Sequence, residues 1–207
     1  MGIERNDAIK IVDQFFALQR SYALEARWIV SPERYTRMVE AGIIVDWEPD
    51  NEATREPLLE HVGHLPVLAT FLYPHAEHKE KIDLGRVLIM LAIHDIGETT
   101  KGDVFAYDKT SEDEKGELEA ARLLLPPELF TYYEEFENWE SMDAKFAKAI
   151  DALAPLFHEL VIPAEVTQKR FKMYGFDVDK IEKRKRPHVD WDSNLNAVFD
   201  DLMARYT

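Results

Sequence analysis

Histidines and aspartates at three separated places in this 207-residue chain could bind one metal ion together. His61 stands alone, His94 and Asp95 stand side by side, and Asp151 comes much later. Imidazole and carboxylate groups are good ligands for divalent cations, and such a mixed set leaves coordination positions for water and substrate. The chain has no cysteine, which excludes thiolate metal sites, cysteine nucleophiles and disulfides. These residue types therefore indicate a site of mixed nitrogen and oxygen ligands for a divalent metal.

The segment VLIMLAIHDIGE at 87–98 carries the strongest of these signals. Its almost unbroken apolar run predicts a buried helix over about 81–96, with Gly97 as the stop. His94 and Asp95 close this helix, where an unpaired buried carboxylate would be costly. A bound cation would compensate that cost.

The other two positions also fall on expected helices. His61 lies on a helix predicted over about 58–73, and Asp151 lies between Ala147 and Ala154, small residues that let another helix approach closely. Each residue taken singly has a structural alternative: a hydrogen-bonded core histidine, or an aspartate that caps a helix or pairs with a cation. Only the convergence of three helices would make them one metal site.

Helical periodicity runs through nearly the whole chain, and we identify no convincing strand, internal repeat or low-complexity linker. Polar loops are expected over 43–57 and 99–110, and the basic run KIEKRKRP at 180–187 is interpreted as a solvated surface. The predicted fold class is all-α. The remaining helices are expected over about 7–19, 31–42, from 111, 126–139, 141–160, 163–175 and 192–205.

Composition limits the partners. A hydrophobic content of 46% suffices for the core of one domain. Forty acidic against twenty-five basic residues give a net charge of −15, which repels nucleic-acid backbones but allows a small phosphate ester if a metal and local cations offset it. No apolar stretch reaches about eighteen residues, and the N-terminus is charged, so we expect a cytoplasmic protein without a membrane span.

The order of these residues resembles a known family. His61, His94, Asp95 and Asp151 reproduce the H…HD…D pattern of HD-domain metal-dependent phosphohydrolases. More narrowly, HDIGETTKGDV at 94–104 is similar to the HDxxE…GD segment of the HD-domain 5′-deoxynucleotidases. Proline-glutamate, acidic aromatic and AKFAKAID segments within 124–153 also match that family.

The resemblance covers about 55–160 and implies a single-domain, HD-type helical bundle. The domain would span 1–207, with N-terminal helices over 4–42 and C-terminal helices over 163–206 packed on the metal-binding core. It would hold one divalent metal ion, such as Mn²⁺, Co²⁺ or Mg²⁺. A single ion is favoured because two-metal HD phosphodiesterases need further histidines, and this chain has none over 95–150.

The resemblance also implies catalytic roles for Glu98 and Asp103. Glu98, one turn past His94, would orient the attacking water or take its proton, or would act as a helix-end charge. Asp103 would protonate the leaving 5′ oxygen or hydrogen-bond the sugar. These alternatives stay open at this point.

Phosphate and base contacts are less well defined. Family members carry an arginine close to a tryptophan upstream of the first ligand, and Trp47 lies at a suitable distance, but Val45 and Asp46 adjoin it instead. The local arginine is therefore missing. Other substrate-binding candidates are Arg55, His64 and Lys101, each with a solvated or packed alternative.

The expected activity is a 5′-nucleotidase that releases phosphate from deoxyribonucleoside or ribonucleoside 5′-monophosphates. One alternative is hydrolysis of another small phosphate ester, and another is a non-catalytic metal-containing module that binds nucleotides or assembles with partners. Many relatives of this kind form dimers, so a homodimer is an open alternative to a monomer.

Overall fold

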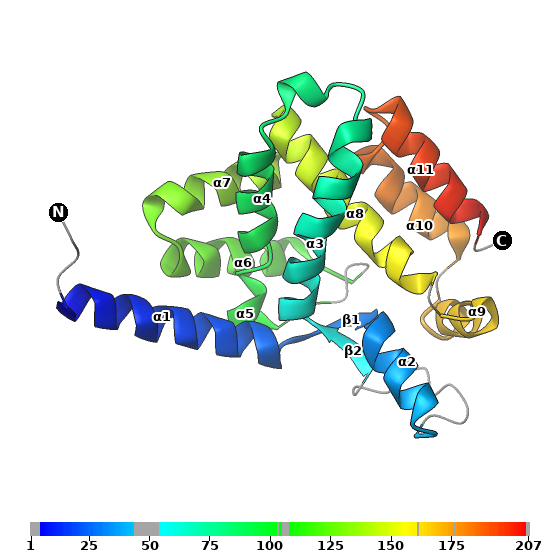
Figure 1. Cartoon of the computed structure of the whole chain (residues 1–207), viewed down its shortest axis with the longest axis horizontal. Helices are drawn as coiled ribbons and strands as arrows, with labels where there is room; N and C mark the ends of the chain where they lie inside the picture. Colours follow the sequence, from blue (N-terminus) through cyan, green and yellow to red (C-terminus); the bar gives the residue numbers. More distant parts are fainter. Residues whose placement is uncertain are drawn as a thin grey trace.

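Helices dominate the computed structural model, which describes residues 5–43, 54–102, 104, 108–160, 162–175 and 177–205. The predicted all-α class is confirmed, with a two-stranded sheet as the exception (Figure 1). The helices are α1 Arg5–Leu24, α2 Pro32–Glu40, α3 Leu58–Leu72, α4 Leu84–Ile93, α5 Glu98–Lys101, α6 Ser111–Leu124, α7 Pro127–Asn138, α8 Met142–Glu159, α9 Ala164–Met173, α10 Val178–Lys185 and α11 Ser193–Ala204. Short 3-10 turns within the described residues include η2 Tyr73–His75, η3 Lys79–Lys81 and η4 Arg186–His188.

Helices α3, α4 and α8 pack on one another at the centre of the molecule (Figure 1). The apolar face of α4 is fully buried there, and so are Ala147 and Ala154 of α8. Alanine side chains at these two positions let α8 lie close to its neighbours, as the sequence predicts. The convergence of three helices is therefore present in the fold.

Local capping explains why several helix boundaries follow from sequence. The Ser31 hydroxyl accepts a hydrogen bond from the Arg34 amide at 3.3 Å, and the Ser141 hydroxyl accepts one from the Ala144 amide at 3.1 Å. Such caps satisfy amides that the first helical turn leaves without partners. Pro155 lies inside α8 without ending it.

The buried helix ends earlier than expected. Asp83 caps the start of α4, and the helix stops at Ile93, so the predicted span of about 81–96 is too long at both ends. Gly97 is not its stop, because Gly97 has a φ of −63° and directly precedes α5. Helix α5 also replaces the start of the loop expected over 99–110.

Close packing explains the glycine at position 97. A Cβ built there would lie 2.5 Å from the carbonyl oxygen of Glu117 in α6. We expect Gly97→Ala to push α6 away and to lower the free energy of unfolding by about 2 kcal/mol, or roughly 4–8 °C in melting temperature. Gly63→Ala is the matched control, because a Cβ on Gly63 in α3 meets nothing within 4 Å. Circular dichroism melts of both variants check this, and equal melting temperatures would contradict it.

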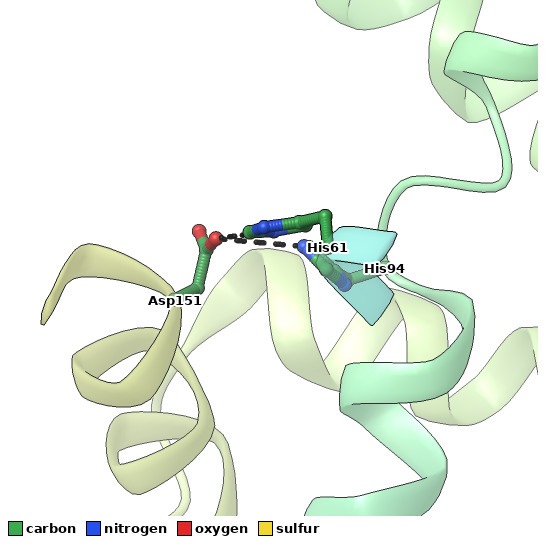
Figure 2. Close-up of side chains that lie close together, drawn as sticks. All are labelled: His61, His94 and Asp151. Atoms are coloured by element: carbon green, nitrogen blue, oxygen red, sulfur yellow. Dashed lines mark hydrogen bonds and ion pairs between the residues drawn. The ribbon is translucent and has the colours of Figure 1, made fainter. Parts of the chain in front are cut away.

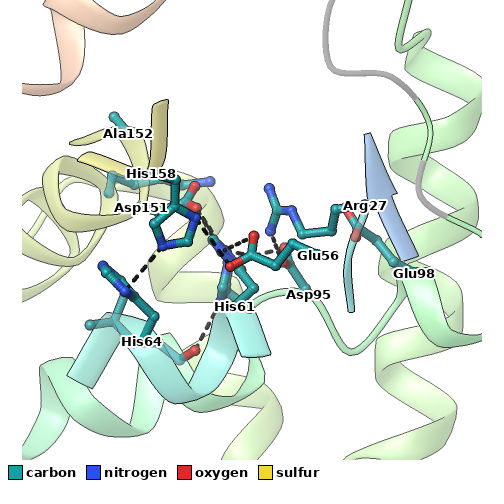
Figure 3. A network of polar contacts seen from close by, with 12 residues as sticks. Arg27, Glu56, His61, His64, Asp95, Glu98, Asp151, Ala152 and His158 are labelled. Atoms are coloured by element: carbon teal, nitrogen blue, oxygen red, sulfur yellow. Dashed lines mark hydrogen bonds and ion pairs between the residues drawn. The ribbon is translucent and has the colours of Figure 1, made fainter. Parts of the chain in front are cut away.

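Two short strands were not expected from the sequence. Strand β1, Ala26–Val30, pairs antiparallel with β2, Arg55–Pro57. Strands of five and three residues are too short to show a period-two pattern, and β2 falls in the region predicted as a loop over 43–57. The pairing matters because it brings Arg27 and Glu56 to the base of α3 (Figure 3).

The opening helix is longer than predicted and only its C-terminal part is packed. Tyr22 is buried against Leu58 and Ile96, whereas Ile11 and Phe15 are 54% and 63% exposed. The apolar stripe of α1 therefore does not bury its N-terminal half in the described part of the chain. Within that part, no helix combines the length and the apolar composition required to cross a bilayer.

Candidate metal centre

Three predicted ligands from three helices meet at one point. His61 comes from α3, His94 directly follows α4, and Asp151 comes from α8 (Figure 2). Asp151 Oδ1 lies 3.2 Å from His61 Nε2 and 3.5 Å from His94 Nε2. One ligand atom from each residue lies within 4.8 Å of the others. The three residues therefore form a group that could hold a metal ion.

Asp95, the fourth predicted ligand, lies at the edge of this group. Its Oδ1 is 3.1 Å from His94 Nε2, and its Oδ2 is 3.6 Å from His61 Nε2. The same Oδ2 accepts a hydrogen bond from the Arg27 guanidinium at 2.5 Å (Figure 3). Asp95 is thus placed between the histidines and a cation from β1.

The outer hydrogen bonds of the two histidines orient their rings. His94 Nδ1 lies 3.0 Å from the Leu91 carbonyl oxygen, which can only accept, so the neutral ring carries its proton on Nδ1. His61 Nδ1 faces the Glu56 carboxylate at 3.4 Å. Both Nε2 lone pairs are therefore directed at the carboxylates, as in metal sites whose histidines are held from behind.

The charges at this point favour a cation. Burial disfavours protonation of His94, but Asp95 and Asp151 outweigh it and raise its pKa to about 10. Burial also opposes ionisation of the two aspartates, yet hydrogen bonds and charge from the histidines hold the pKa of Asp151 well below its ordinary value, and His94 and Arg27 do the same for Asp95. The site therefore attracts positive charge.

The spacing of the donors also fits a divalent ion. Two ligand atoms, each about 2.1 Å from one ion and at right angles, lie about 3 Å apart. The separations of 3.1–3.6 Å among the imidazole and carboxylate atoms are close to that value. Within the described residues, the buried His94 Nε2 makes no hydrogen bond of good geometry although Asp95 Oδ1 lies 3.1 Å away, as expected for two atoms that would share one metal ion. Two imidazoles and two carboxylates form a suitable set for a first-row divalent cation.

Behind His61 lies a chain of buried polar groups (Figure 3). Glu56 joins His61 to His158, whose Nδ1 is 3.3 Å from the Glu56 carboxylate, and His158 Nε2 lies 3.1 Å from His64 Nδ1. Burial lowers the pKa of His158 to about 4, so its ring is neutral at pH 7. The structure thus places His64 in contact with His158 and not among the side chains that line the cavity described below.

Glu56 is expected to strengthen metal binding by holding His61. Glu56→Gln keeps the size of the side chain but removes its charge, and loss of such an outer partner weakens metal affinity about 10- to 100-fold. Glu60→Gln is the control, because Glu60 pairs with Arg34 on the surface. Competition with a fluorescent chelator for Mn²⁺ or Co²⁺ measures the change. Equal affinities of the two variants would show that Glu56 does not support the site.

A cavity of about 770 Å³ opens beside the metal-ligand group. His94, Asp95 and Asp151 line it, together with Glu98. Glu98 is buried at the start of α5, and its carboxylate lies 3.9 Å from the Lys109 ammonium. Lys109 also contacts the Glu117 carboxylate at 2.5 Å, so Lys109 links Glu98 to α6. The volume is that of a pocket for a small-molecule ligand.

Basic side chains also line the cavity. Lys148 of α8, Lys185 of α10 and His188 of η4 are among them, so the interpretation of 180–187 as solvated surface is wrong for Lys185. Burial lowers the pKa of Lys185 to about 8, which leaves its ammonium mostly charged at pH 7. The run also lies on α10, a helix that the sequence did not predict, and only the tertiary packing shows that one of its side chains meets the cavity.

The other predicted site residues fall differently. Trp47 and Asp103 lie outside the described residues, and Lys101 ends α5 with a side chain outside the description. Arg55 lies on β2 and is not among the side chains that line the cavity. The sequence reasoning missed Arg27, although Arg27-Trp28 is itself an arginine beside a tryptophan upstream of His61. Glu56 carried no comparable signal.

Comparisons with known proteins agree with this geometry. A family model described as HD domain matches residues 46–192. Curated relatives include the 5′-deoxynucleotidase HDDC2 of Dictyostelium discoideum, 27% identical over 63% of this chain, and that of Homo sapiens, 26% identical over 51%. The crystal structure of a predicted metal-dependent phosphohydrolase from Magnetospirillum magnetotacticum has a TM-score of 0.71 and 27% identity, and the match covers 94% of this chain and 92% of that one.

The curated relatives are matched only in part. The chain spans 63% of the length of the Dictyostelium discoideum protein and 53% of that of the Homo sapiens protein. The matched structure, in contrast, is covered almost completely. The similarity therefore extends over the whole fold for the solved structure and over about half to two thirds of the curated proteins.

Proposed function

Because this chain belongs to the HD domain family, we propose that it is a metal-dependent phosphohydrolase that acts on small phosphate monoesters. The observation that carries the proposal is the meeting of His61, His94 and Asp151 beside a cavity of about 770 Å³. Asp95 at their edge completes a set of two imidazoles and two carboxylates. A donor set of this kind, next to a pocket lined by both acidic and basic side chains, suits hydrolysis of an anionic ester.

The metal ligands in this proposal are His61, His94, Asp95 and Asp151. When bound, a divalent cation supplies Lewis acidity that makes water a better nucleophile near neutral pH and draws charge from phosphoryl oxygens. A single ion such as Mn²⁺, Co²⁺ or Mg²⁺ fulfils the role. The protein's own part is to hold the ligands ionised and oriented, which the outer partners Glu56, Arg27 and the Leu91 carbonyl do.

Glu98 is the proposed general base. Its buried carboxylate lines the same cavity as Asp95 and Asp151, and it begins the helix that follows the ligand pair. There it would accept a proton from the attacking water as the bond between phosphorus and the ester oxygen breaks. The leaving oxygen needs a proton in return, and Asp103 is the proposed donor or a partner of the sugar.

We further infer that the substrates are nucleoside 5′-monophosphates, with the 2′-deoxy forms preferred. The names of the matched curated relatives support this choice. A cytoplasmic location and a homodimer belong to the same proposal. Trp47, Arg55, His64 and Lys101 stay predicted contacts of the nucleotide.

The test is a metal-replete screen of deoxyribonucleoside and ribonucleoside 5′-monophosphates, with released phosphate as the readout. We expect turnover with Mn²⁺ or Co²⁺, loss on chelation with EDTA and recovery when the metal is returned. Turnover of simple phosphate esters without nucleotide preference would support the coarser function alone. Absence of phosphate release from every ester, with metal shown to be bound, would overturn the proposal.

A further inference from the structure

Basic side chains gather around Asp151 on the wall of the cavity. Lys185 Nζ donates a hydrogen bond at 2.7 Å to the carbonyl oxygen of Ala152, the residue after Asp151. Lys148 precedes Asp151 by three residues on α8, so the two side chains lie on the same face of that helix. Two ammonium groups therefore flank one predicted metal ligand.

The two ammonium groups have different hydrogen-bond partners among the described residues. Lys148 Nζ contacts the Glu137 carboxylate at 3.0 Å, while Lys185 donates to a neutral carbonyl oxygen. Asp151 is engaged with His61 and His94. An anion in the cavity would give the half-buried Lys185 ammonium, whose described hydrogen bond goes to a neutral oxygen, a charged partner.

The presence of Lys148 and Lys185 at this cavity does not follow from a general excess of basic residues. The chain carries a net charge of −15, so the general field repels phosphate esters. A phosphate monoester carries nearly two negative charges near neutral pH. Its binding requires cations at the place where the phosphoryl group lies, and the metal-ligand group and the lysines occupy the same cavity.

Lys185 also has an alternative, purely structural role. Pro155 lies inside α8 and lacks an amide N–H, which disturbs the hydrogen bonding of the preceding turn, and Lys185 donates to a carbonyl of that turn. A structural donor and a phosphate ligand respond differently to Lys185→Gln. Glutamine retains an N–H donor but has no charge.

We propose that Lys185 and Lys148 form a phosphate-binding subsite that holds the phosphoryl group of the substrate beside Asp151. His188 lines the same cavity and is a neighbour of this subsite. The inference rests on the proposed function for the class of substrate. It adds which side chains of the chain bind the charge of that substrate.

The test measures binding of inorganic phosphate by isothermal titration calorimetry to protein loaded with Mn²⁺ and freed of excess metal. Lys185→Gln and Lys148→Gln are compared with Lys183→Gln, an exposed position of α10 with the same change in charge. A hydrogen bond to a charged group predicts about 10- to 100-fold weaker phosphate binding for the first two variants. The phosphate affinity of Lys183→Gln should stay within about twofold of that of the unmodified protein, because an exposed charge contributes little.

The outcomes separate the subsite from the activity. Hydrolysis in the unmodified protein with unchanged phosphate affinity in Lys185→Gln and Lys148→Gln would overturn the subsite but not the proposed function. Weaker phosphate binding without any hydrolysis in the unmodified protein would support the subsite while the proposed function fails. A lower melting temperature of Lys185→Gln with unchanged phosphate affinity assigns Lys185 the structural role and overturns the inference. Where substrates are turned over, we expect the KM to rise more than kcat falls, and Lys185→Arg to restore much of the affinity.

Discussion

Asp95→Asn is expected to lower kcat/KM for phosphate-ester hydrolysis about a thousandfold, which corresponds to about 4 kcal/mol of lost transition-state stabilisation. Asparagine has nearly the same size but no charge. The substitution removes the carboxylate that lies 3.1 Å from His94 Nε2 and that accepts a hydrogen bond from Arg27. The cation would then lose a ligand, and the attraction of the site for positive charge would decrease.

Two measurements check this expectation. Metal content after dialysis should fall in Asp95→Asn, and phosphate release at saturating metal should remain far below that of the unmodified protein. Asp190→Asn, an exposed position, is the matched control and should keep both properties. Because Arg27 loses its carboxylate partner, a melting curve is needed to show that Asp95→Asn is folded. A folded variant with full metal content and activity would exclude Asp95 as a ligand.

Glu98→Gln is expected to reduce kcat by about 10²- to 10⁴-fold while metal content and KM change little, as for the removal of a general base. Glutamine retains the shape of the side chain but cannot take the proton from water. Glu98 lines the cavity at the start of α5, one turn beyond the ligand pair. Its effect should therefore fall on the chemical step.

Steady-state kinetics with metal analysis distinguish this role from a structural one. Glu119→Gln is the control, since Glu119 is exposed on the neighbouring α6 and carries the same charge. Loss of metal from Glu98→Gln would indicate that Glu98 supports the ligands instead of the water. A kcat within about threefold of the unmodified protein would remove Glu98 from the catalytic residues.

Much of the helical fold follows from local rules. Ser31 and Ser141 cap helices whose starts were predicted at these residues, and Pro155 is tolerated inside α8. Elements defined by long-range contact were harder to predict. Strands β1 and β2 show no periodic pattern because they are short. Gly97 is predicted as a helix stop, but in the structure the absence of its side chain leaves room for the backbone of Glu117.

The property that was hardest to predict is which side of each helix is buried and which is exposed. The opening helix was predicted, yet its apolar side chains Ile11 and Phe15 are exposed because nothing in the described part of the chain covers the start of α1. Lys185 shows the opposite error, since a basic run suggested a solvated surface and its side chain lines a cavity. The type of a side chain indicates whether it prefers water, but its burial depends on which other elements pack against it in the fold.

The sequence by itself determined the all-α class and the four candidate ligands, because residue type, order and helical period are local properties that one chain displays. It also suggested that His61, His94 and Asp151 would converge. Only the tertiary structure decided how the ligands are held, through Glu56 behind His61 and Arg27 beside Asp95. Those contacts join residues far apart in the chain through strand pairing and helix packing. These contacts depend on distances in space, which cannot be calculated from the spacing of residues along the sequence.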